Sequence, residues 1–105
     1  MEQPITAPSS APDFLIHDEG DHVGVSVQDV SAGHRRAVYM DSDRELEFDV
    51  TENVPLGHKV ALQDLGEGVE LIEYRVTVGL TRKPIKKGAM VHVHNLRSAR
   101  WQTSV

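Results

Sequence analysis

The chain contains no cysteine among its 105 residues. This absence excludes a disulfide framework, a thiolate metal site and a cysteine nucleophile. Phe, Tyr and Trp make up only 5% of the residues, so the core of a single small domain must be built from Val, Leu, Ile and Ala. The sequence also lacks a G-x-S-x-G nucleophile motif, a P-loop and a dinucleotide-binding glycine pattern. No pair of carboxylates stands out as a catalytic acid and base, so a complete active site is difficult to build from this chain.

Positive charge is scarce as well. The chain has 11 Lys and Arg residues and 16 Asp and Glu residues, which gives a net charge of -5. A surface that neutralises phosphates needs a cationic excess, so we expect neither a nucleic-acid partner nor an anionic membrane partner. The N-terminus, MEQPITAPSSAPD, lacks the basic and apolar regions of a signal peptide, and no apolar run reaches transmembrane length. We therefore expect a soluble, cytoplasmic protein.

Short strands are the dominant pattern. A short apolar run stands at residues 14–17. Strands are predicted at residues 23–27, 36–40, 46–50, 69–74, 76–80 and 90–94, and residues 58–65 could begin as a strand and end as one helical turn. Gly and Pro turn signals recur about every ten residues, which is typical of a mostly-β, barrel-like or clip-like domain. We place this domain at residues 13–101, after a Pro-rich flexible tail at 1–12 and before a tail at 102–105. The phrases VSAGH and VPLGH echo each other, but they are too short to indicate a duplication.

Two histidines near the C-terminus are the first candidate for chemistry. On a strand, His92 and His94 point to the same side, so they could share a metal or bind one anion. Alternatively, they could line a polar groove or a subunit contact and bind nothing, because a metal site needs a third ligand. The amide of Asn95 could hold a carboxylate or hydroxyl, or simply form a turn. We expect Val91 and Val93 to face inward and both rings to be accessible.

A second candidate lies in the middle of the chain, where His58 and Lys59 follow Gly57. A lysine beside a histidine can bind a carboxylate, and either can move a proton, although the segment could also be a solvated loop. His17 stands before two acidic residues. It could be a third ligand for whatever the C-terminal histidines hold, or it could hydrogen-bond a turn.

The C-terminal residues LRSARW contain the only tryptophan of the chain. Trp and Arg are enriched at interface hot spots, so Arg97, Arg100 and Trp101 are predicted to bind a partner. The alternative is that Trp101 folds back onto its own domain.

Three phrases carry a resemblance to a known family. In order, they are FLIHDEGDHVGVSVQDVSAG, VTENVPLGHKVALQDLGEGVELIEY and IKKGAMVHVHNLRSARW. They resemble the SAF-type domain of the altronate/galactarate dehydratase family over nearly all of residues 13–101. The most specific parts are VPLGHKVAL and the HVHN segment at 92–95. The sequence departs from the family at EYRVTVGL, where the family usually has KYGxxIG: Arg75 replaces a glycine, although Gly79 is retained.

The resemblance implies a β-clip fold and a role in α,β-elimination on a sugar acid. It further implies a large catalytic subunit or C-terminal portion that supplies the base and a divalent metal, typically iron. A split form with a separate small subunit is implied for altronate dehydratase-like enzymes and for sulfolactate sulfo-lyase. In this scheme His58, Lys59, His92, His94 and Asn95 would contact the substrate carboxylate. The competing hypothesis is a non-catalytic carbohydrate-binding or assembly module, which would need neither GHK nor HVHN. The segment HRRAVYMDSDRELEF is not diagnostic of a substrate.

Overall fold

The computed structural model describes residues 11–91 and 96–98, and no helix occurs among them. The strands are β1 Phe14–Ile16, β2 Val23–Ser26, β3 Gly33–Tyr39, β4 Glu45–Val50, β5 Lys59–Ala61, β6 Glu70–Glu73, β7 Val76–Thr81, β8 Met90–Val91 and β9 Leu96–Ser98. The mostly-β prediction is confirmed. The helical turn expected near residue 65 is wrong, because Leu65 forms a β-bridge with Ile85 there. No helix that could cross a membrane is found in the described part of the chain.

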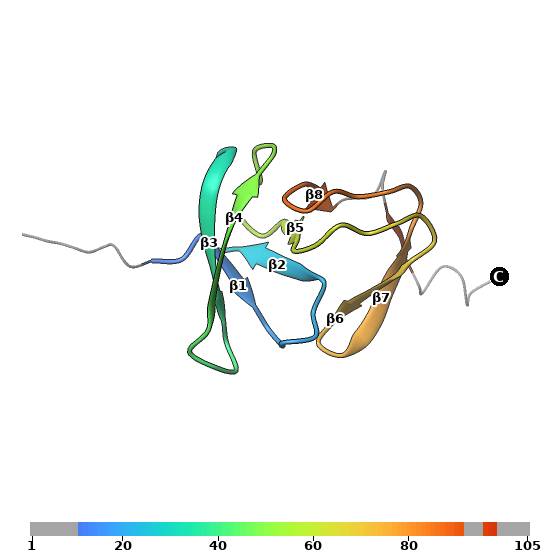
Figure 1. Cartoon of the computed structure of the whole chain (residues 1–105), viewed down its shortest axis with the longest axis horizontal. Coiled ribbons are helices and arrows are strands. Elements are labelled where there is room, and N and C mark those ends of the chain that lie inside the picture. Colours follow the sequence, from blue (N-terminus) through green and yellow to red (C-terminus); the bar gives the residue numbers. More distant parts are fainter. Residues whose placement is uncertain (1–10, 92–95, 99–105) are drawn as a thin grey trace, which may run out of the picture.

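The strands form two sheets (Figure 1). The larger has the order β4-β3-β1-β2-β5-β8, and the smaller has the order β6-β7-β9. Every pair is antiparallel except β1 and β3, which run parallel. Strand β1 thus lies between β2, its antiparallel neighbour, and β3, its parallel neighbour. Strand β9 was not predicted. It pairs with β7, with Arg97 opposite Leu80.

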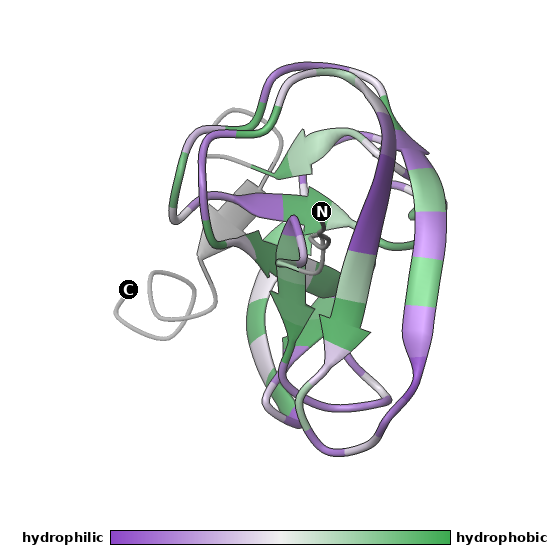
Figure 2. Ribbon diagram, turned by 90° about the vertical axis from the view of Figure 1, so that its left-hand side faces the viewer, coloured by the Kyte–Doolittle hydropathy of each residue, from purple (hydrophilic) through white to green (hydrophobic). Residues whose placement is uncertain are grey.

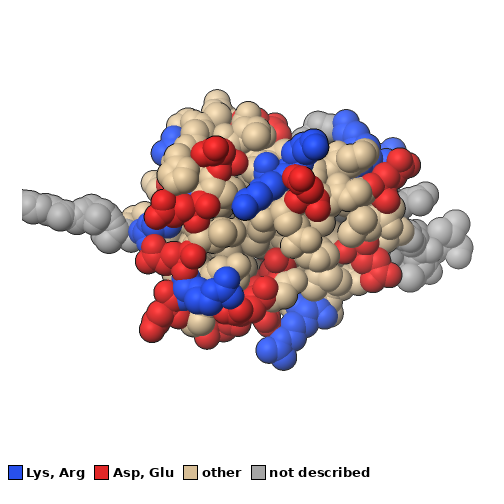
Figure 3. All heavy atoms as spheres, viewed as in Figure 1, with Lys and Arg blue, Asp and Glu red and all other residues tan. Residues whose placement is uncertain are grey.

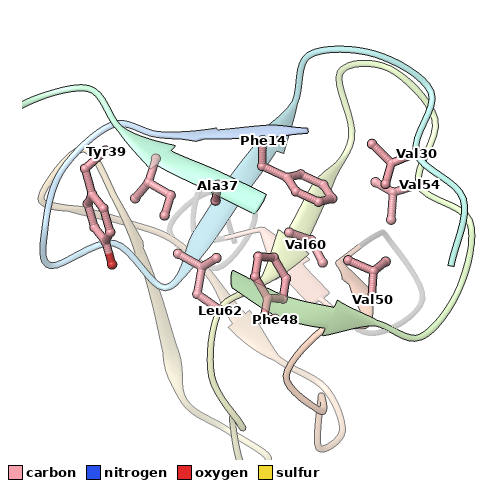
Figure 4. Packing of buried hydrophobic residues seen from close by; sticks show 10 residues of the cluster. Phe14, Val30, Ala37, Tyr39, Phe48, Val50, Val54, Val60 and Leu62 are labelled. Carbon is pink, nitrogen blue, oxygen red and sulfur yellow. The ribbon is translucent and has the colours of Figure 1, made fainter. Parts of the chain in front are cut away.

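Two hydrophobic cores hold the sheets together. The first gathers around the tilted rings of Phe14 and Phe48, whose centroids are 5.7 Å apart (Figure 4). The second consists of the buried residues Val23, Ala61, Leu65, Leu71, Ile85 and Val91. Hydrophilic and hydrophobic residues alternate along β4 (Figure 2), as expected for a strand with one face on a core. In β5, Val60 belongs to the first core and Ala61 to the second, so this short strand separates the two.

One turn unit occurs four times in the described residues. In each copy a strand ends, a bridge-forming residue follows four positions later, and a glycine with positive φ stands three positions after that. The strand ends are Ser26, Val50, Ala61 and Thr81, the bridge residues are Val30, Val54, Leu65 and Ile85, and the glycines are Gly33, Gly57, Gly68 and Gly88. Positive φ favours glycine because it has no Cβ. The echo between VSAGH and VPLGH is therefore part of a fourfold structural repeat.

The four copies interlock in two pairs. Val30 bridges Val54 in the first pair, and Leu65 bridges Ile85 in the second. The strand end of one copy then accepts a hydrogen bond from the turn glycine of the other. Gly57 N donates to Ser26 O over 3.0 Å, Gly88 N to Ala61 O over 2.8 Å, and Gly68 N to Thr81 O over 2.8 Å. The bridge residues of the first pair are buried in the first core, and those of the second pair are buried in the second core.

The two pairs meet where the turn at Gly88 packs against the end of β4. Thr51 N donates to Gly88 O over 2.9 Å, and Met90 N donates to Glu52 Oε2 over 3.0 Å. A Cβ on Gly88 would lie 3.1 Å from the carbonyl carbon of Asp49 and still closer to its oxygen. Only glycine fits this junction, for reasons of both conformation and space.

Candidate functional site

Lys59 begins β5, and its backbone lies between those of two neighbouring strands. It pairs with Val25 of β2 on one side and with Val91 of β8 on the other. Lys59 and Ala61 share one face of the strand, and Ala61 is part of the second core. The aliphatic stem of Lys59 therefore runs along the edge of this core, and its side chain keeps 37% of its surface in water. This geometry suits a lysine that presents an ammonium group to an anion.

His58 is exposed, but its backbone is held firmly. Its amide donates to the hydroxyl of Ser26 over 3.1 Å, and its carbonyl accepts from the same hydroxyl over 3.1 Å. Ser26 is buried at the end of β2. The turn that carries His58 and Lys59 is thus fixed from within the domain, while the imidazole is exposed and its Nδ1 lies 3.4 Å from the carbonyl oxygen of Leu56.

A buried carboxylate faces Lys59 from the smaller sheet. Glu73 stands on β6 with Leu71, and the two side chains share the face that packs against the second core. The Glu73 side chain is only 9% exposed; its Oε1 lies 3.8 Å from Lys59 Nζ and its Oε2 lies 3.7 Å from His17 Nε2. A buried charge needs such partners because desolvation is costly. One carboxylate therefore joins three segments that are far apart in the chain.

His17 follows β1 and contacts three side chains. Its ring stacks on Tyr74, with centroids 3.9 Å apart and planes 17° apart. Its Nδ1 lies 3.1 Å from Met40 Sδ, and its Nε2 faces Glu73. No group of three His, Asp or Glu side chains that could hold a metal occurs in the described ranges. The proposed role of His17 as a third ligand stays a prediction, because the other two candidate ligands lie outside those ranges.

The turn between β6 and β7 is unusual in its residues. Tyr74 and Arg75 have φ values of 57° and 65°. Positive φ at both central positions is the geometry of a type I′ hairpin, which favours Asn-Gly. The expectation that Arg75 occupies a position suited to glycine is confirmed. Two aspartates hold this turn: Asp21 Oδ1 accepts from Tyr74 N over 2.9 Å, and Asp18 Oδ2 accepts from Arg75 Nε over 2.6 Å.

The electrostatics of this loop follow from the same contacts. The hydrogen bond and the charge of Arg75 lower the pKa of Asp18 below its ordinary value, although burial opposes the shift. Acidic side chains gather elsewhere, over β3 and β4 (Figure 3). That face is poorly suited to an anionic ligand.

The remaining predicted residues are only partly placed. His92, His94, Asn95, Arg100 and Trp101 lie outside the described residues, as do most of the two predicted tails at 1–12 and 102–105. Val91 is buried as expected, and it stands opposite Lys59 immediately before the HVHN segment. The backbone of Arg97 belongs to β9.

Glu73 and Tyr74 were missed at the level of sequence. A signal for Glu73 was present: period-2 alternation along VELIEY puts it on the same face as Leu71, where a carboxylate is out of place. Nothing in the sequence indicated that Tyr74 would stack on His17.

Comparisons with known proteins identify the family of this chain. Residues 12–99 match the model of the altronate/galactarate dehydratase SAF domain. The alpha subunit of (2R)-sulfolactate sulfo-lyase from Chromohalobacter salexigens is 44% identical over 91 residues, which cover 85% of this chain and 97% of that subunit. Altronate dehydratase from Bacillus subtilis is 29% identical over 85 residues, covering 81% of this chain and 16% of that enzyme. Altronate dehydratase from Escherichia coli is 32% identical over 78 residues, covering 74% of this chain and 15% of that enzyme. The chain therefore belongs to the altronate/galactarate dehydratase SAF domain family.

Proposed function

We propose that this chain is the alpha-type subunit of a lyase that acts on a 2-hydroxy acid, with (2R)-sulfolactate as its substrate. The observation that carries the proposal is the 44% identity to a sulfo-lyase alpha subunit over 97% of that subunit. The identities to the two altronate dehydratases are 29% and 32%. The word alpha in the name of the relative implies at least one further subunit, and we assign the larger share of the active site to such a partner.

The proposed reaction is an elimination. A base removes the proton from the carbon that carries the hydroxyl, its electron pair forms a carbon–carbon double bond, and the neighbouring carbon–sulfur bond breaks as its pair leaves with sulfite. The resulting enol tautomerises to pyruvate. Negative charge spreads onto the carboxylate during proton removal, so the reaction needs fixed cationic contacts there.

Lys59 is the best-supported contact for this carboxylate. Its ammonium is partly exposed, and the buried carboxylate of Glu73 keeps it at the rim of the second core. Exposed His58 stands beside it, and we propose that His92, His94 and Asn95 complete the set. The resemblance also implies a divalent metal, iron, that would polarise the substrate; we assign it to the partner, because the described residues of this chain do not assemble a ligand set.

A second candidate is the elimination of water from a sugar acid such as altronate. The family model and both altronate dehydratases support this reaction class. The chemistry at the carboxylate would be the same, and only the leaving group would differ. The two reactions are distinguished by their second product, which is sulfite in one case and water in the other.

The experiment is to produce the chain together with the protein of the same genome that corresponds to the remaining sulfo-lyase subunit. Sulfite release from (2R)-sulfolactate and 2-keto acid formation from altronate and galactarate are then measured. We expect sulfite and pyruvate only when both chains are present, and we expect Lys59→Met to lower kcat/KM at least tenfold while the exposed control Lys86→Met does not. A 2-keto acid from altronate without sulfite would establish the dehydratase alternative. No turnover with any substrate would favour the binding-module hypothesis.

A further inference from the structure

Three exposed apolar side chains surround the cluster formed by His17 and Glu73. Tyr74 stacks on the ring of His17, and Met40 contacts Nδ1 of the same imidazole through its sulfur. Val76 stands opposite Glu73 in the β6–β7 hairpin, so the two side chains lie on one face. All three are more than half exposed. Single exposed apolar residues are ordinary, but several apolar side chains next to one another indicate a surface that binds another molecule.

The hairpin turn keeps its bulky residues against local preference. Asn-Gly would suit the positive φ values of Tyr74 and Arg75 better. Strained backbone of this kind persists where the surrounding structure holds it and function uses it. Here Asp21 holds the backbone of Tyr74, and Asp18 holds the guanidinium of Arg75. The turn therefore presents an aromatic ring and a cation in a fixed position, and Tyr and Arg are residue types enriched at interface hot spots.

We propose that Met40, Tyr74, Arg75 and Val76 form a surface on which the other subunit of the lyase docks. This inference rests on the proposed function and extends it from the site to its partner. The surface is continuous with the candidate site, because His17 contacts both Met40 and Tyr74 on the one hand and Glu73 on the other.

The partner is favoured over other occupants by what its docking would do. A subunit seated here would cover the rim at Glu73 and Lys59, exclude water from it and strengthen the electrostatic attraction of Lys59 for a substrate anion. The guanidinium of Arg75 would offer an acidic residue of the partner a charged contact at the edge of the apolar patch. A second copy of this chain would bring another Arg75 or the same apolar patch, without supplying the missing catalytic groups.

The test uses polar substitutions and a matched control. Tyr74→Asn removes the ring but keeps a residue that tolerates the left-handed backbone, and Met40→Gln makes the patch polar. Leu56→Gln is the control: Leu56 is 61% exposed and Tyr74 is 60% exposed, but Leu56 lies in the turn beside Ser26, at the other end of β2. Association of each variant with the corresponding subunit from the same genome is measured by titration calorimetry, after thermal melting has shown that the variant is folded.

We expect Tyr74→Asn to raise the dissociation constant at least tenfold and Met40→Gln at least threefold, while Leu56→Gln changes it less than twofold. Equal effects of Tyr74→Asn and Leu56→Gln would overturn the inference while leaving the proposed function intact. Failure of the unchanged chain to associate with that subunit would overturn both. Sedimentation of the chain alone provides a further check, because a dimer that Tyr74→Asn dissociates would show that the occupant is a second copy.

Discussion

Gly88 offers the sharpest test of how the two halves of the domain are joined. Its φ is 88°, and a left-handed conformation costs a residue with a Cβ about 1–2 kcal/mol. In addition, a Cβ would lie 3.1 Å from the carbonyl carbon of Asp49 and closer to its oxygen, so β4 or the turn must move. Overpacking of this kind costs about 1–3 kcal/mol. The expected loss in the free energy of unfolding for Gly88→Ala is therefore about 2–5 kcal/mol.

Gly57 is the matched control for this substitution. It has a φ of 84° in the equivalent turn, but nothing lies within 4 Å of the position that a Cβ would occupy. Gly57→Ala should lower the free energy of unfolding by only about 1–2 kcal/mol. Alanine also lowers the conformational entropy of the unfolded chain, and this stabilising effect is the same in both variants. Urea denaturation at equal m-values measures both losses. Equal losses would show that the junction between Gly88 and β4 is loose and would refute this account of the packing.

Three further predictions concern single side chains. Arg75→Gly should raise the free energy of unfolding by about 0.5–1 kcal/mol in urea denaturation. Glycine removes the strain of the left-handed backbone, and this gain exceeds the loss of the exposed ion pair with Asp18. Glu47 and Asp49 raise the pKa of His34 above 6.5. The ion pairs of protonated His34 therefore stabilise the fold fully below pH 6.5, and this stabilisation is lost as the pH rises through the folded-state pKa of His34. An NMR titration should show the raised value, and Glu47→Gln should lower it. Glu73→Leu should change stability by less than about 1 kcal/mol, because its lysine partner can turn to water, yet it should reduce turnover of the two-chain enzyme; a large loss of stability by thermal melting would contradict this.

Most strands could be predicted because the signals were local. Val23 and Val25 alternate around Gly24, and Leu46, Phe48 and Val50 alternate with acidic residues, as a strand with one buried face requires. Strand β9 could not be found in this way. Its three residues, LRS, show no alternation, and their hydrogen bonds come from β7, which is a long-range partner.

The fourfold turn unit was visible only in part for a similar reason. Its spacing depends on bridge residues whose partners lie 20 or more positions away, as between Val30 and Val54. A sequence shows the glycine of each turn but not the strand that accepts its amide hydrogen. Two short phrases with Gly-His were therefore an insufficient basis for a repeat, whereas φ angles and hydrogen bonds identify all four copies.

The candidate site depends both on local sequence signals and on long-range packing. Lys59 and His17 were singled out by residue type and neighbours, but their common partner, Glu73, depends on how β6 of the smaller sheet packs against β2 of the larger sheet. A well-packed apolar side chain in place of a buried ion pair is often neutral or stabilising, so stability alone does not explain a carboxylate at this position. Stability does not explain Tyr74 and Arg75 in a turn that favours Asn-Gly either. Departures from local rules are expected at functional sites, and these two departures meet at one imidazole, that of His17.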